Sequence, residues 1–225
     1  MGLNKSNGNM YPYITHTFNV IKGACPHKCS YCYMKSLPGE LKPVRLDRSE
    51  VKTDLGAGNF VFVGSSCDMW AHEIEADWIR RTLLKCGTHQ NRYLFQSKNP
   101  HRFLEFAEYL PPSVVLATTI ESDRDHIESG GAAIDQRVDG IIRATRSGYE
   151  VSVTIEPIME IWDLSRMLEM MDDIRPAWIT IGADSKGHNL PEPSAETVKF
   201  LATELKRRAH QVILKRNLGR IWNGD

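Results

Sequence analysis

Three of the five cysteines lie within eight positions, in the stretch GACPHKCSYCYMKS. Their spacing is Cys25-x3-Cys29-x2-Cys32, and a tyrosine stands on each side of the last cysteine. Thiols this close together can coordinate a zinc ion, form disulfides or hold an iron–sulfur cluster. The chemistry of the chain therefore depends first on which of these three roles the cysteine loop has.

A structural zinc site normally takes four ligands, often from two cysteine pairs. No second C-x2-C pair follows, and Cys67 and Cys86 are isolated. His27 could complete a Cys3His site, but Cys25, His27 and Cys29 at alternate positions would crowd one ion. Clustered cysteines in an odd total are unlike a secreted disulfide framework. The loop is best interpreted as binding a [4Fe–4S] cluster through three thiolates, with one iron left for a small-molecule chelator.

Strand-like and helix-like segments alternate through nearly the whole chain and must position this loop. Strands are predicted at 15–23, 59–66, 92–98, 113–121, 149–159, 177–183 and 210–215. Helical spacing of apolar residues occurs near 70–84, 101–110, 133–148, 164–171 and 194–205. Such alternation predicts a parallel sheet with outer crossover helices. We expect a single α/β domain, a partial (β/α)6-type TIM barrel, with an N-terminal extension at 1–14 and a C-terminal strand and tail at 210–225.

Polar segments follow most of the predicted strands. After the cysteine loop these are GSSCD, SKN, ESD, EPIME and GADSKGHN. Active sites of β/α barrels lie at the C-terminal ends of the strands. We therefore expect these segments and the cysteine loop to converge on one mouth.

The bulk composition is that of an ordinary globular protein of 225 residues, with 28 basic and 28 acidic residues. Zero net charge argues against an indiscriminate polyanion binder, although it is compatible with a local basic groove. No apolar run approaches the roughly 20 residues that span a bilayer, and the N-terminus lacks the apolar core of a signal peptide. We expect a cytoplasmic protein without a membrane partner.

The motif C-x3-C-x2-C after a first strand, with Tyr31 just before the last cysteine, resembles the signature of the radical S-adenosylmethionine (SAM) superfamily. The resemblance covers most of the chain and implies that 1–225 is a radical SAM core domain. It implies that Cys25, Cys29 and Cys32 bind three irons of a [4Fe–4S] cluster, and that SAM chelates the fourth. It also implies reductive cleavage of SAM to methionine and a 5′-deoxyadenosyl radical that abstracts hydrogen from a substrate, with an electron donor such as flavodoxin or ferredoxin.

The segments GSSCDMW, SK and ES more narrowly resemble the spore photoproduct lyase branch, its "DNA repair photolyase"-like relatives and small phage-type proteins. The resemblance implies SAM contacts by the pair Cys67-Asp68 with the adjacent Ser66, by Lys98 to the SAM carboxylate, and by Ser122 to the ribose. Glu156, after the fifth strand, is expected to face the adenine or the substrate.

The chain departs from that branch around its hydrogen-donating cysteine. In the branch this cysteine lies a few residues before the aspartate, whereas here Ser65 falls near that place and Cys67 directly precedes Asp68. Cys67 and Tyr33 are candidates for a catalytic radical relay. The alternative for Cys67 is a small buried thiol at a strand end. The chain also has little room for the branch's long N-terminal extension and C-terminal β-hairpin.

Several other residues have simpler interpretations. Cys86 is expected to be structural, and Trp70 is expected to pack in the core rather than stack on a base. His72 with Glu73 and Glu75 suggests either a second metal site or a solvated helical turn. Candidate substrate contacts follow the last two strands and include Asp184, Lys186, His188, Asn189 and Lys215.

The leading hypothesis is a radical SAM enzyme, of lyase, isomerase or hydrogen-abstracting type, that repairs or modifies a nucleic-acid base or nucleotide. A second hypothesis keeps the radical chemistry and assigns a peptide or small metabolite as substrate. A third is a zinc- or cluster-stabilised nucleic-acid-binding module without catalysis.

Overall fold

Seven neighbouring parallel strands form the centre of the computed structural model, which describes residues 3–224. The order of the eight-stranded sheet is β1-β2-β5-β6-β7-β8-β9-β10, and only β1 runs antiparallel to its neighbour. The strands are β1 (Asn4–Lys5), β2 (His16–Phe18), β5 (Phe60–Val63), β6 (Arg92–Ser97), β7 (Val114–Thr119), β8 (Glu150–Ile155), β9 (Trp178–Ile181) and β10 (Gln211–Leu214). Because β1 and β10 are unpaired edges, the barrel is open. The predicted α/β class and partial barrel are confirmed.

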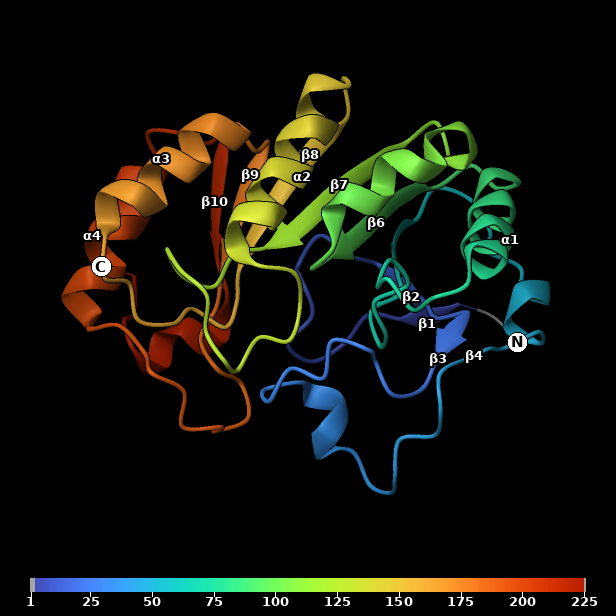
Figure 1. Cartoon of the computed structure of the whole chain (residues 1–225), viewed down its shortest axis with the longest axis horizontal. Coiled ribbons are helices and arrows are strands. Elements are labelled where there is room, and N and C mark those ends of the chain that lie inside the picture. The colour runs from blue at the N-terminus through green and yellow to red at the C-terminus, as the bar shows by residue number, and fades with distance from the viewer. Residues whose placement is uncertain (1–2, 225) are drawn as a thin grey trace.

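From β5 onward, a helix connects each parallel strand to the next and follows the outer side of the curved sheet (Figure 1). They are α1 (Ala76–Gly87), the 3-10 helix η3 (Pro100–Tyr109), α2 (Ile134–Arg146), α3 (Leu164–Ile174) and α4 (Ala195–Leu205). Three short 3-10 helices are η1 (Tyr33–Ser36), η2 (Glu50–Lys52) and η4 (Arg216–Arg220). In residues 3–224, no helix has both the length and the apolar character needed to cross a bilayer.

The first predicted strand, at 15–23, is divided into two short strands. After β2 the chain leaves the main sheet, and β3 (Ile21–Lys22) pairs antiparallel with β4 (Arg45–Leu46). The side-chain oxygen of Asn19 accepts from the amide of Ser66 at 3.1 Å, which holds the turn against the end of β5. The cysteine loop therefore starts from a separate two-stranded ribbon.

Two predicted helices also differ in detail. The helix expected near Trp70 begins only at Ala76, because the Asp68 side chain accepts from the Trp70 amide at 2.9 Å and holds a turn there. The segment after Pro100 is a 3-10 helix, and Asn99 does not cap it. The Asn99 side-chain Nδ2 instead donates to the Trp70 carbonyl at 3.0 Å.

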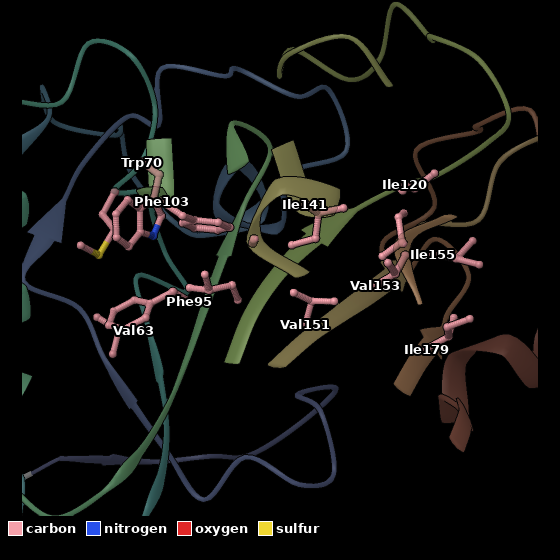
Figure 2. Close-up of a cluster of buried hydrophobic side chains, with 14 of the residues drawn as sticks. Val63, Trp70, Phe95, Phe103, Ile120, Ile141, Val151, Val153, Ile155 and Ile179 are labelled. Carbon is pink, nitrogen blue, oxygen red and sulfur yellow. The ribbon is translucent and has the colours of Figure 1, made fainter. Parts of the chain in front are cut away.

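The main core lies between the sheet and the helices and extends from β5 to β9 (Figure 2). Trp70 is fully buried, and its ring meets Phe95 and Phe103 edge-on, with centroids 5.5 and 4.9 Å away. Cys86 is also fully buried in this core. The expected structural roles of Trp70 and Cys86 are therefore confirmed.

A second cluster covers the inner face of the sheet. Tyr11 and Ile14, from the segment expected as an N-terminal extension, pack against Phe62, Leu94 and neighbouring strand residues. The Tyr11 hydroxyl donates to Gln96 at 2.9 Å. The segment thus fills one part of the barrel interior and leaves the region at the C-terminal strand ends open.

Ser194 caps α4, since its hydroxyl accepts from the Thr197 amide at 3.1 Å. We expect Ser194→Ala to lower the free energy of unfolding by about 1 kcal/mol, because an amide of the first turn loses its acceptor. Urea denaturation measures the change. Ser147→Ala is the control, because the exposed Ser147 hydroxyl makes no hydrogen bond within residues 3–224; equal losses in both variants would contradict the prediction.

Candidate active site

A cavity of about 700 Å³ opens at the C-terminal ends of the parallel strands. Its walls come from the cysteine loop, from residues following β5, β6, β8, β9 and β10, and from the N-terminal segment near Asn9. The cysteine loop and four of the five expected polar segments converge on this cavity, whereas the fifth, ESD after β7, does not line it.

Nine of the ten site residues chosen from the sequence line this cavity: Cys25, Cys29, Cys32, Tyr33, Ser66, Cys67, Asp68, Lys98 and Glu156. Ser122 does not line it. Ser122 is fully buried, and its hydroxyl donates to the Glu160 carbonyl at 2.5 Å. The preceding Glu121 instead contacts Lys98, which lines the cavity. Its contact with a ribose stays a prediction.

The three clustered cysteines are free thiols at the cavity wall, with Cys29 buried and the other two partly buried. Within residues 3–224, no three or more His, Cys, Asp or Glu side chains gather closely enough to hold one metal ion. His27 bonds to Asp68 at 2.7 Å and joins the thiols in no such group, so a Cys3His zinc site has no support in the described residues. A [4Fe–4S] cluster makes a different demand, because each thiolate binds its own iron. Three free thiols on one cavity-facing loop fit that group in number and type.

Cys67 is buried at the cavity wall beside Cys25. A hydrogen bond from the Cys67 thiol lowers the pKa of Cys25 to about 6. The same contact raises the pKa of Cys67. Tyr33 is 41% exposed and donates to the Ser65 carbonyl at 3.2 Å, two residues before Cys67. Both relay candidates thus lie at the cavity wall.

Asp68 ties the cysteine loop to the strand ends. Its Oδ2 accepts from His27 at 2.7 Å, from the Ser97 hydroxyl at 2.9 Å and from the Lys98 amide at 2.9 Å. Burial opposes charge on both groups, but their pairing lowers the pKa of Asp68 and raises that of His27. Within residues 3–224, Asp68 Oδ1 accepts only from the Trp70 amide. This oxygen can therefore accept a hydrogen bond from a further donor.

Glu121 is the centre of a buried ionic network that the sequence analysis missed. It accepts from Lys98 and Tyr31, from the Ser129 hydroxyl at 3.1 Å and from Arg137 at 2.7 Å. Glu121 and Arg137 are each 2% exposed, and Lys98 is 13% exposed. Two cations therefore share one buried carboxylate. The sequence feature that could have indicated this network is Arg137, a charged residue on the apolar stripe of a predicted helix.

A second polar cluster lies around Glu156, which lines the cavity as expected, while Glu160 is exposed. Its Oε2 accepts from Lys215 at 2.8 Å, and its Oε1 accepts from Asn9 and Asn217, both at 3.2 Å. The carboxyl group packs against Gly182, where a Cβ would lie 2.8 Å from it. No spacing in the sequence links Asn9 to this cluster.

The remaining candidates divide between the cavity and the surface. Asp184 and Lys186 line the cavity, and His188 bonds to Asp184 at 2.7 Å. Asn189 does not line it. His72, Glu73 and Glu75 are exposed, as a solvated turn requires.

Comparison with known proteins found no matching family model and no matching curated protein. Solved structures of spore photoproduct lyase are similar in fold. A cysteine-to-serine mutant aligns with a TM-score of 0.60 at 13% identity, over 96% of this chain and 77% of that one. A cysteine-to-alanine mutant gives 0.60 at 13% over 99% and 79%. The complex with a dinucleoside spore photoproduct gives 0.58 at 11% over 89% and 64%. At these identities the likeness shows a shared fold.

Proposed function

We propose that this chain is a radical SAM enzyme that acts on a nucleic-acid base or nucleotide. The observation that carries the proposal is the placement of three free thiols on one loop, facing a cavity at the C-terminal ends of a partial barrel. The fold shared with spore photoproduct lyase supports it, because that protein has been solved with AdoMet and a dinucleoside spore photoproduct bound.

Cys25, Cys29 and Cys32 would hold a [4Fe–4S] cluster, and the cavity that they line would bind SAM. Together these groups supply reductive cleavage of SAM and a 5′-deoxyadenosyl radical that abstracts hydrogen. Lys98 is suited to bind the SAM carboxylate, because Glu121 is already shared with Arg137 and leaves the network one positive charge in excess. The free capacity of Asp68 Oδ1 suits the SAM amino group.

The charges around the cavity favour an anionic substrate. The lining carboxylates Asp68, Glu156 and Asp184 each pair with a histidine or lysine. The lining lysines Lys5 and Lys186 form no ion pair within residues 3–224. The uncompensated charge at the mouth is therefore positive, which suits the phosphate of a nucleotide better than a neutral metabolite.

Amide side chains at the cavity add hydrogen-bonding groups for a base. Asn9 and Gln96 both line it, and a carboxamide can donate to and accept from the edge of a nucleobase. Cys67 and Tyr33 are retained as the proposed relay residues, since both line the same cavity.

The test is anaerobic reconstitution with iron and sulfide, followed by SAM and dithionite. We expect reductant-dependent formation of 5′-deoxyadenosine and methionine, quantified by liquid chromatography and mass spectrometry. Incorporation of iron and sulfide without any SAM cleavage would instead indicate a binding module without catalysis. Deuterium transfer into 5′-deoxyadenosine from labelled DNA and thymidine derivatives, compared with labelled peptides, identifies the substrate class.

Lys98→Met is expected to raise the KM for SAM by about 10- to 100-fold, because a hydrogen bond to a charged group contributes about 1.5–3 kcal/mol. Steady-state formation of 5′-deoxyadenosine at varied SAM gives the value. Lys199→Met is the matched control, since Lys199 is exposed on α4 and does not line the cavity. An unchanged KM in Lys98→Met would remove Lys98 from the SAM site.

A further inference from the structure

The charges of this neutral chain are unevenly distributed. The segment from Lys22 to Lys52 contains seven lysines and arginines and three aspartates and glutamates, a net charge of +4. Since the whole chain has 28 residues of each sign, the rest carries −4. This basic lobe, residues 22–52, is the segment that holds the three clustered cysteines.

Two of the three acidic residues of the basic lobe share one lysine. Lys22 contacts Asp47 at 3.0 Å and Glu50 at 2.8 Å, which leaves Glu40 as the remaining acid. Six further cations are exposed and form no ion pair within residues 3–224: Lys28, Lys35, Lys42, Arg45, Arg48 and Lys52. The outer surface of the lobe is therefore positive without internal compensation.

The backbone of the lobe brings several of these cations close to the cysteine loop. The Ala24 amide donates to the Lys42 carbonyl at 2.8 Å, one residue before the first clustered cysteine. Arg45 lies opposite Lys22 across the β3–β4 ribbon. The Lys35 ammonium donates to the Lys28 carbonyl at 3.0 Å, which joins the two sides of the loop. Lys28, Lys35, Lys42 and Arg45 thus lie on or beside the cysteine loop in the backbone.

These six cations lie outside the cavity, because none of them lines it. The lobe extends from the sheet on the side away from α2 and α3 (Figure 1). It also exposes apolar surface, since Tyr33 is 41% and Leu37 is 47% exposed on and just after η1. An apolar centre with a charged rim is the usual anatomy of a protein interface.

We propose that the basic lobe docks an acidic one-electron carrier protein of the flavin or iron–sulfur type. The inference rests on the proposed function, in which the reduced carrier is oxidised by one electron and that electron enters the site held by the three thiolates. Complementary charge speeds such encounters, and electron-transfer interfaces are small. Nucleic acid is the less suitable occupant, because a substrate must reach the cavity, whose own unpaired cations, Lys5 and Lys186, lie on other segments.

The test compares two electron donors on the reconstituted protein. In a charge-reversal variant, Lys42→Glu, Arg45→Glu and Arg48→Glu are combined. We expect the KM for a reduced acidic flavodoxin to rise at least tenfold, while the rate with dithionite stays within twofold of wild type. The matched control combines Arg146→Glu, Lys199→Glu and Lys206→Glu, which are exposed on or beside α2 and α4 and change the net charge equally. It should leave both rates unchanged.

The milder combination of Lys42→Gln, Arg45→Gln and Arg48→Gln should give an intermediate KM for flavodoxin. It serves as a control for misfolding caused by charge reversal. Equal flavodoxin KM values in the two charge-reversal variants would overturn the proposal. So would loss of oligonucleotide affinity with an unchanged flavodoxin KM, which would identify a nucleic-acid surface. Absence of SAM cleavage with dithionite in the wild type would instead reject the proposed function. Salt-dependent flavodoxin binding, measured without turnover, then decides the docking surface independently.

Discussion

Cys29→Ala is expected to reduce SAM cleavage by more than about 100-fold, since even the loss of an outer partner of a metal ligand costs about 10- to 100-fold. Cys29 is the most buried of the three clustered thiols, so no exposed side chain can readily replace it. The measurements are 5′-deoxyadenosine formed per chain after reconstitution and iron bound per chain. Both should fall together.

Cys86→Ala is the matched control for this result. It also removes a buried thiol, but one that lies on α1 in the main core and does not line the cavity. We expect it to retain iron and activity, with a loss of about 1 kcal/mol in the free energy of unfolding from the small cavity left behind. Full activity in Cys29→Ala would reject the cluster assignment.

Glu121→Gln is expected to lower the free energy of unfolding at pH 7 by about 3–5 kcal/mol. The substitution leaves Arg137 and Lys98 in the interior without their carboxylate, and breaking a buried ion pair on one side typically costs this much. Glu150→Gln is the control, because the Glu150–Arg92 pair is about 40% exposed on both sides and should contribute less than about 1 kcal/mol. Urea denaturation of both variants tests the contrast.

The same network predicts a dependence of stability on pH. Burial alone would raise the pKa of Glu121, but Lys98 and Arg137 lower it from 4.5 to about 2. The stabilisation is therefore complete above the unfolded value and is lost as pH falls from about 4.5 toward 2. By pH 3 the wild type should lose about 2 kcal/mol from this group, so the deficit of Glu121→Gln should shrink. A deficit that is the same at pH 7 and pH 3 would contradict this assignment.

Local signals accounted for most of the architecture. The alternation of apolar strands with helical spacing predicted the parallel sheet, and the Ser194 cap and the positive φ of Gly148 after α2 follow local preferences. The first strand was predicted too long, because its apolar pattern continues through Ile21 while its backbone partners change to β4. Periodicity records which face is buried and carries no information on which strand provides the hydrogen bonds.

The candidate site shows the same division. The spacing of Cys25, Cys29 and Cys32 and their place after a first strand determined the chemistry to be expected, because ligands on one short loop are encoded by neighbouring residues. Only the tertiary structure decided that Tyr31 meets Glu121 across 90 positions and that Asn9 meets Glu156 across 147. Buried charges must find partners wherever the fold places them, since an unpaired one is too costly to desolvate. Such partners are therefore set by three-dimensional proximity, and no local pattern announces them.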